Sequence, residues 1–417
     1  MYKRQGRHLR TLSAHRGTPL YTFGYDPSSR ALTSITDHVG NVTSISRTAQ
    51  TVTIRSPFGQ VTQLGLDPNG HVQTVTNPQS EVTQFATQPD GLLTDMSDPR
   101  GLTHHFEYDG ATSGRLALDV DGAPGSPGTR LSIGEFVGGW LVEHRSPEDR
   151  LTNYVVDRRG SFPNRSTVEK RTISHGFNAE LRSTIDIAAD GSQSTEQPDG
   201  TKVTVLATAP DPRWGTRASF ASSVRTDVGF PTTTHSMTVA RTRTSTLSAA
   251  ADPFSVAGET ITTTLSGANL PNATTTAVYA PTPSPTWTMT SPAGRQSRST
   301  LDALERVTKL EALGTDPVAL HPIEYHYDLR GRLDRITHGP RVYTTTYDAI
   351  TGWPTATTDP ANLGVTYGLR DANGRPLEVE LPGGRSLELS YDANGNVTSI
   401  IPPNRPAHAY GLSLIHI

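Results

Sequence analysis

Histidine and glutamate residues are the first candidates for chemistry in this chain. His104 and His105 are adjacent, and His321, Glu324 and His326 lie close together in a second segment. In a β-strand, Glu324 and His326 would share one face, as two metal ligands require. The helical His-Glu-x-x-His pattern of zinc proteases is absent. We therefore interpret these side chains as solvent-facing or strand-packing residues, and we expect no metal site, no catalytic residue and no cofactor.

Aspartates offer a second kind of chemistry, because paired carboxylates serve glycosidases and aspartic proteases. Each of the recurrent aspartates, however, begins a tetrapeptide that is typical of a turn. At that position an Asp side chain accepts hydrogen bonds from its own backbone. We favour this structural interpretation for Asp37, Asp67, Asp98, Asp157 and Asp371.

Tyrosines recur directly before aspartates. A row of aromatic side chains could bind carbohydrate, whereas cross-strand packing of aromatic pairs contributes about 0.2–1 kcal/mol each. Because the tyrosines keep the same place in a repeat, we favour packing. The pairs begin at Tyr25, Tyr108, Tyr327, Tyr347 and Tyr391.

The elements that position these residues are short strands joined by regular turns. Asp67-Pro68-Asn69-Gly70 is the clearest turn, with Asp, Pro, Asn and Gly each at its favoured position. A type I turn followed by a left-handed Gly is a common hairpin connection. The same shape recurs at 37–40, 56–59, 88–91, 98–101, 157–160, 197–200, 291–294, 328–331, 371–374, 381–384 and 392–395.

The spacing of the turns fixes the kind of element between them. From Pro57 to Asp109 a turn occurs about every ten residues, and a similar spacing returns from Asp328 to Pro402. The six or seven residues left between turns are too few for a typical helix of about 11 residues and suit a strand. The fold is therefore predicted to be all-β, an array of short antiparallel strands and hairpins.

Three details refine this prediction. Apolar residues three apart, such as Val72 and Val75, would lie on opposite faces of a flat strand. Either both faces of the sheet are partly covered, or a bulge follows the turn Gly and shifts the register; we favour the bulge. Glu305 stands where the repeat expects Gly, which predicts a strained or rebuilt turn. The Thr-rich stretch 201–300 is interpreted as longer strands of the same sheet, with disorder as the alternative.

Composition excludes several classes of protein. The 417 residues carry 37 Lys and Arg against 40 Asp and Glu, and there is no long basic run, which argues against a nucleic-acid binder. No cysteine is present, so there is neither a disulfide framework nor a thiolate metal site. No apolar run reaches the length of a membrane span.

With the turns and the Tyr-Asp pairs in place, a family resemblance becomes specific. Segments such as Tyr325-His326-Tyr327-Asp328-Leu329-Arg330-Gly331-Arg332 and Tyr391-Asp392-Ala393-Asn394-Gly395-Asn396 resemble the RHS or YD repeats. The resemblance covers a single array over residues 6–411. It is clearest at 20–120 and 320–403, with a divergent, Thr-rich middle at 120–300. Residues 1–5 and 412–417 resemble adaptor-derived read-through, and we expect them to be non-native ends of an interior fragment.

The resemblance carries expectations about fold, function and partners. YD repeats form a spiralling β-sheet shell around a hollow interior, so we expect part of such a shell. It implies a non-enzymatic scaffold of a secreted or cell-surface bacterial protein, enclosing a C-terminal toxin effector of the same parent chain. Secretion machinery is a possible further partner; nucleic acid and a membrane span are not expected. The alternative is a surface adhesin or carbohydrate-binding repeat that recognises a glycan.

Overall fold

The chain folds into antiparallel β-strands that form one continuous sheet, as the turn spacing predicts. In the computed structural model, 34 strands of the described residues belong to this sheet, and each pairs with its neighbours in sequence. The described residues include one helical turn, α1 (Gly110–Ser113). The structure describes residues 6–122, 125–158, 167–176, 181–189, 192–230, 233–268, 270–314 and 320–411. The predicted non-native ends, 1–5 and 412–417, lie outside these ranges.

We divide the sheet into three strips in chain order. The opening strip comprises β1 (Arg10–Leu12), β2 (Pro19–Tyr25), β3 (Leu32–Asp37), β4 (Val42–Arg47), β5 (Thr51–Arg55), β6 (Val61–Leu66), β7 (Val72–Thr76), β8 (Val82–Thr87), β9 (Leu93–Ser97) and β10 (Thr103–Asp109). The middle strip comprises β11 (Arg115–Val120), β12 (Thr129–Phe136), β13 (Gly139–Arg145), β14 (Leu151–Asp157), β15 (Thr167–His175), β16 (Arg182–Ala188), β17 (Gln193–Glu196), β18 (Lys202–Asp211), β19 (Gly215–Phe230), β20 (Thr233–Leu247), β21 (Val256–Gly267), β22 (Leu270–Ala280) and β23 (Thr286–Thr290).

The closing strip completes the sheet. It comprises β24 (Gln296–Leu301), β25 (Val307–Leu313), β26 (Ile323–Tyr327), β27 (Leu333–His338), β28 (Arg341–Tyr347), β29 (Pro354–Thr358), β30 (Gly364–Tyr367), β31 (Glu378–Leu381), β32 (Arg385–Tyr391), β33 (Val397–Ile401) and β34 (His408–Ala409).

The predicted turns form with the predicted geometry. In ten of the twelve tetrapeptides the Gly N–H donates to the carbonyl of the first residue, as Gly70 does to Asp67 at 3.0 Å. The Gly φ angles in these ten turns lie between 76° and 91°, in the left-handed region. Glu305 adopts φ 65° and donates to Asp302 at 3.1 Å, so its turn keeps the shape and carries the predicted strain. The turn predicted at 157–160 extends outside the described residues.

A bulge explains the spacing of three between apolar residues. Val72 pairs with Leu66 and Val75 pairs with Leu64, with a register shift between the two pairs. The extra residue returns both valines to one face of the sheet. The same shift brings together the apolar pairs at 333/336 and 397/400.

The bulge prediction is wrong for two other turns. No shift occurs after Gly40 or Gly59, so Val42 and Ile45 point to opposite faces, as do Val61 and Leu64. Bulged and unbulged turns alternate along much of the chain. Because consecutive turns of an antiparallel ribbon lie at opposite edges, the sheet has a bulged edge and a plain edge.

The Thr-rich middle forms long strands of the same sheet, as predicted. β19 has 16 residues and β20 has 15, about twice the length of strands in the other strips. Their register continues from β18 through β22, where Thr262 and Thr264 face Thr276 and Thr274. The alternative of disorder is wrong for the described part of this stretch.

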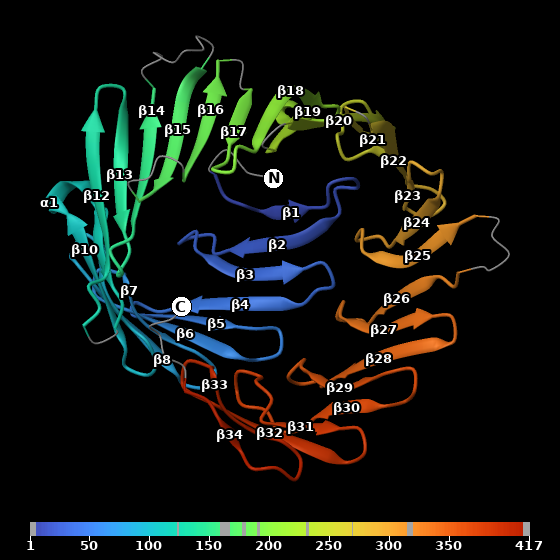
Figure 1. Ribbon diagram of the computed structural model, residues 1–417. Coiled ribbons are helices and arrows are strands. Elements are labelled where there is room, and N and C mark those ends of the chain that lie inside the picture. The colour runs from blue at the N-terminus through green and yellow to red at the C-terminus, as the bar shows by residue number, and fades with distance from the viewer. Residues whose placement is uncertain are drawn as a thin grey trace.

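The sheet winds into a spiral. Figure 1 shows β1 and β2 lying inside a ring formed by the middle and closing strips. Hydrogen bonds between the opening and closing strips join residues 285 to 296 positions apart, which is the length of chain in one winding. Within the described chain, few apolar side chains are fully buried: Leu151, Val256, Tyr279, Leu301 and Val379.

The turn geometry leads to a first prediction. Gly70→Val places a β-branched residue at φ 88° with no atom within 4 Å, so backbone strain alone should lower stability by about 1–2 kcal/mol. Gly395→Val should cost more, because its Cβ would also lie 2.9 Å from Arg375 Nη1. Urea unfolding of both variants would test this order. Gly70→Asn is the control, since Asn tolerates the left-handed region; a Gly70→Val protein as stable as this control would contradict the assignment.

Candidate functional site

The histidine candidates are paired individually and do not form one site. His105 Nδ1 lies 2.8 Å from Asp95 Oδ1, and this exposed pair raises the pKa of His105, mainly through the Asp95 hydrogen bond. His104 lies on the other face of β10 and stacks on Phe106. Among the residues that the structure describes, no group of three His, Asp or Glu side chains is placed to hold a metal ion.

The second histidine group is also dispersed. Glu324 and His326 share a face of β26, as predicted, but His326 is hydrogen-bonded to Asp334 on the neighbouring strand. The ring of His321 lies against Gly339 instead, where an added Cβ would be 2.6 Å from it. His321 and His326 therefore have separate neighbours, and the three side chains do not form one site.

The turn aspartates bind their own turns. Asp67 Oδ1 accepts hydrogen bonds from the backbone of Asn69 at 2.8 Å and of His71 at 2.9 Å. Asp37, Asp98, Asp302, Asp328, Asp359, Asp371 and Asp392 each accept two backbone bonds in the same way. The structural interpretation is confirmed for these turns.

The motif tyrosines pack within the sheet. Tyr327 OH donates to the carbonyl of Val307 at 3.0 Å, and the Arg306 guanidinium lies 4.1 Å from the ring centroid. Arg306 also forms an ion pair with Asp302 of its own turn. This turn comes two turns of the ribbon before the one that follows Tyr327. The motif thus links each Tyr to the previous bulged turn. The same arrangement joins Arg332 to Tyr347 and Arg375 to Tyr391.

This packing explains why the motif combines its residue types. The Asp organises the turn, the Arg that follows the Gly pairs with that Asp, and the Arg plane covers the next Tyr. Because each Tyr hydroxyl is used by a backbone carbonyl, the prediction of cross-strand packing is confirmed. The tyrosines at the five motif positions do not form a free aromatic row for a glycan.

The distinctive feature of the structure is a seam between the plain edge of the opening strip and the bulged edge of the closing strip. Arg330 Nη1 donates to Asn41 Oδ1 at 3.0 Å, and Gln60 Nε2 donates to the Thr351 carbonyl at 2.9 Å. Figure 1 shows these opening-strip hairpins directed towards the closing strip. The seam thus joins turns to turns rather than strand to strand.

Ion pairs strengthen the part of the seam that involves the last strands of the closing strip. Arg375 Nη2 lies 2.7 Å from Glu81 Oε1, and Arg100 Nη1 lies 3.1 Å from Asp392 Oδ2. Burial opposes ionisation of Glu81, but hydrogen bonds led by that from Arg375 outweigh it and lower the pKa of Glu81. These are partly buried pairs, so each partner depends on the other for solvation.

The seam ends in the most buried cluster of the described chain. The loop between β1 and β2 lies against β21–β24, where Val256, Tyr279 and Leu301 form a small core. His15 in this loop packs on Tyr279 and Trp287, with ring centroids 4.7 Å and 5.6 Å apart. A residue of the opening strip therefore completes the core of the middle strip.

Charged groups surround this core. Glu259 and Asp211 are each 3% exposed. Arg243 contacts both, at 3.2 Å and 2.7 Å, and Arg213 donates to the Ala14 carbonyl at 2.6 Å. Burial opposes ionisation of Glu259, but its bond with His15 and the nearby arginines lower its pKa.

Sequence reasoning missed this cluster because its residues lie outside the repeat. His15, Asp211, Arg243 and Glu259 have no common spacing. The available signal was Glu259, the single charge of β21, together with Arg241 and Arg243 in the Thr-rich β20. Only the winding shows that Glu259 meets His15.

One cross-strand row on the concave face of β18–β21 is apolar. Glu259 on β21 contacts the β1–β2 loop, which lies inside the ring in Figure 1, so the face that includes Glu259 is concave. On this face Val205, Val224, Val239 and Leu265 form a cross-strand row. The next row, on the convex face, contains Thr204, Arg225, Thr238 and Ser266.

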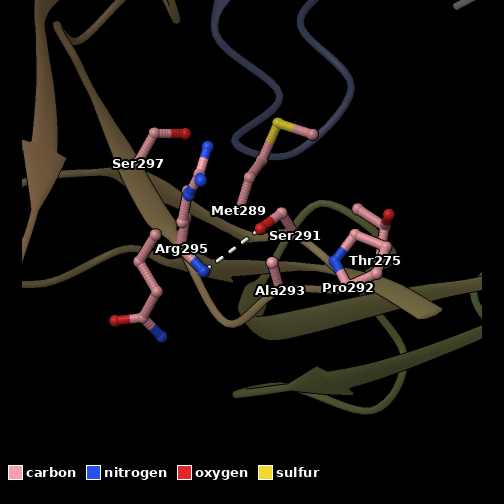
Figure 2. A pocket seen from close by; sticks show the side chains of 8 residues that line it. Thr275, Met289, Ser291, Pro292, Ala293, Arg295 and Ser297 are labelled. Carbon is pink, nitrogen blue, oxygen red and sulfur yellow. Dashed lines mark hydrogen bonds between the residues drawn. The ribbon is translucent and has the colours of Figure 1, made fainter. Parts of the chain in front are cut away.

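A shallow depression opens on the concave side of β22–β24 (Figure 2). It has a volume of about 500 Å³ and is mainly apolar, with Met289 and Pro292 among its lining residues. The Ser291 hydroxyl accepts a hydrogen bond from the Arg295 backbone at 3.1 Å, so it serves the turn. The depression offers an apolar surface and no set of converging polar groups.

These features define a class of protein: a β-shell scaffold, in which one antiparallel ribbon winds on itself and closes through its turns. The sequence profile of the Teneurin YD-shell family matches residues 1–415. The chain belongs to this family, and the predicted RHS or YD-repeat membership is confirmed. No curated protein sequence matches the chain. No helix in the described ranges has the length and apolar character of a membrane span.

Solved structures give distant similarities. Chains in the crystal structures of TcdB2-TccC3 and of TcdB2-TccC3-Cdc42 are each 12% identical, with TM-scores of 0.39 and 0.37. The matches cover 96% and 91% of this chain, but 21% and 19% of those chains. A chain of the Photorhabdus luminescens Tc holotoxin pore is 14% identical, with a TM-score of 0.29, and the match covers 94% and 18% of the two chains. This chain spans about a fifth of their length.

The seam ion pairs give a second prediction. Glu81→Gln and Arg375→Gln should each lower the free energy of unfolding by about 1–3 kcal/mol, because each removes one charged partner from a partly buried group that keeps its other contacts. The double variant should lose less than the sum, with a coupling of about 0.5–3 kcal/mol. A matched cycle on the exposed pair Arg115 and Glu135 should give under about 1 kcal/mol. Equal couplings in the two cycles would show that the seam pair has no special role.

The buried core gives a third prediction. Tyr279 is 1% exposed, and its hydroxyl has no hydrogen-bond partner among the described residues. Tyr279→Phe should therefore leave the melting temperature unchanged or raise it, since it removes an unsatisfied polar group. Tyr279→Ala should lower stability by about 3–5 kcal/mol through the cavity that it leaves. Thermal unfolding of both variants distinguishes packing of the Tyr279 ring from a role of its hydroxyl. A Phe variant as unstable as the Ala variant would show that the hydroxyl stabilises the core and would contradict this prediction.

Proposed function

We propose that this chain is a wall segment of a hollow, non-enzymatic shell that encloses a toxin effector carried by the same parent polypeptide. The parent would be a secreted or surface protein of bacteria. The observation that carries the proposal is the uncovered apolar concave face. Tyr154, Met237 and Met289 on this face are 42%, 38% and 48% exposed, so apolar surface on the concave side is open to an occupant.

The distribution of polarity supports an enclosed occupant. On β18–β21 the convex face has Thr, Ser and charged residues and can meet water, whereas a row of Val and Leu crosses the concave face. An apolar inner wall binds apolar segments of a polypeptide without selecting a particular sequence, because hydrophobic contact is non-directional. This suits a shell whose cargo differs from one parent protein to another.

Family membership supports a scaffold rather than an enzyme. The aspartates that could have served as paired catalytic carboxylates are used by their own turns in the described chain. The proposed scaffold would act by enclosing the effector domain. The choice of the molecule that is attacked would then be a property of that effector domain and not of the shell.

Capture of a non-native polypeptide tests the proposal. Reduced and carboxymethylated α-lactalbumin, labelled with a fluorophore, should bind the chain, and Met289→Lys on the concave face should weaken binding at least several-fold. Val278→Lys is the matched control, since Val278 is 42% exposed on the convex face of the neighbouring strand. Equal binding by both variants, or none by the wild type, would refute a concave cargo surface. Specific signals on a glycan array would instead support the adhesin alternative.

A further inference from the structure

One titratable side chain, His15, is central to the contacts that hold the β1–β2 loop against the wall. His15 Nε2 lies 3.0 Å from Glu259 Oε2 on β21, and His15 Nδ1 lies 3.4 Å from Glu305 Oε2 in the β24–β25 turn. The backbone N–H groups of His15 and Arg16 also donate to Glu305 Oε1, at 3.3 Å and 3.1 Å. The imidazole thus bridges two carboxylates from different elements.

The other charged groups around His15 determine the net charge of this cluster. Arg213 and Asp211 come from the β18–β19 turn, and Arg243 comes from β20. Tyr279 on β22 stacks on the imidazole, and the Arg16 side chain in the same loop is exposed. Three carboxylates, Asp211, Glu259 and Glu305, therefore face two arginines, and a protonated His15 supplies the third positive charge.

We propose that His15 makes closure of the seam pH-dependent: the β1–β2 loop stays docked while the imidazole is protonated and is released when it loses its proton. Neutral His15 would leave three carboxylates opposite two arginines in a cluster where Glu259 is only 3% exposed. The uncompensated charge would be costly at this depth. Hydration of Glu259 through opening of the loop relieves that cost.

The direction of the pH effect follows from the contacts. The hydrogen bond with Glu259 raises the pKa of His15, burial lowers it, and the nearby Glu305 and Glu259 charges raise it, with a net increase above 6.5. A raised folded-state pKa stabilises docking fully below the unfolded value of about 6.5. That stabilisation is lost as the pH rises through the folded-state pKa. The loop should therefore be closed in mildly acidic solution and open in alkaline solution.

This inference goes beyond the proposed function and does not depend on any cargo. Its test uses the whole chain, which contains no cysteine. Spin labels at Thr18→Cys and Ala303→Cys, whose parent residues are hydrogen-bonded across the seam at 3.3 Å, report on docking. Their dipolar broadening should be strong at pH 6 and largely lost at pH 9.5. A second pair, Gln79→Cys and Ala372→Cys, lies at a neutral seam contact and should keep its broadening at both values.

The His15→Gln substitution completes the experiment, because Gln retains a donor but does not titrate. In the 18/303-labelled protein it should abolish the difference between pH 6 and pH 9.5. Three results would overturn the proposal: no change in the wild type, an equal change at the control pair, or a pH response that survives His15→Gln. If the spin labels disturb folding, thermal unfolding of the unlabelled wild type and His15→Gln proteins tests the proposal instead. The melting temperature of wild type should exceed that of His15→Gln at pH 6, and the difference should vanish at pH 9.5; a pH-independent difference would equally overturn it.

Discussion

A single-layer β-sheet has no second layer to cover it, so it must obtain its burial by contact with itself. In this chain that contact is the seam, where the plain edge of one winding meets the bulged edge of another. One winding requires close to 290 residues, as the separation of His15 from Glu305 shows. The ring, the concave face and the buried cluster at its end all depend on this closure.

The repeat is built to make the seam possible. A left-handed Gly and a bulge set the shape of one edge, and the Asp, Arg and Tyr of the motif fix it in place, as Asp328, Arg332 and Tyr347 show. The long side chains at this edge also reach the opposing winding, since Arg330 binds Asn41. One motif therefore stabilises its own turn and recognises the next layer.

Polarity and charge are distributed unevenly over the shell. Most of the described sheet is half-exposed, and on β18–β21 an apolar row lies on the concave face while threonines lie on the convex face. Burial is concentrated around Tyr279 and Glu259, where the opening strip is locked into the middle strip. The rest of the seam is closed by many smaller contacts between turns, such as that of Gln60 with Thr351.

The sequence by itself determined the strands, the turns and the family, because these follow from local rules: Asp67 and Gly70 define a turn through their own backbone preferences. It also determined the long Thr-rich strands and the strain at Glu305. It predicted a bulge after Gly40 as well, where none occurs, since the choice between bulged and plain turns belongs to the edge of the sheet. Only the tertiary structure decided which turns form the seam and that His15 meets Glu259, because those contacts depend on how far the ribbon twists over a whole winding. Twist accumulates from every strand pair, so no local pattern encodes which residues finally meet.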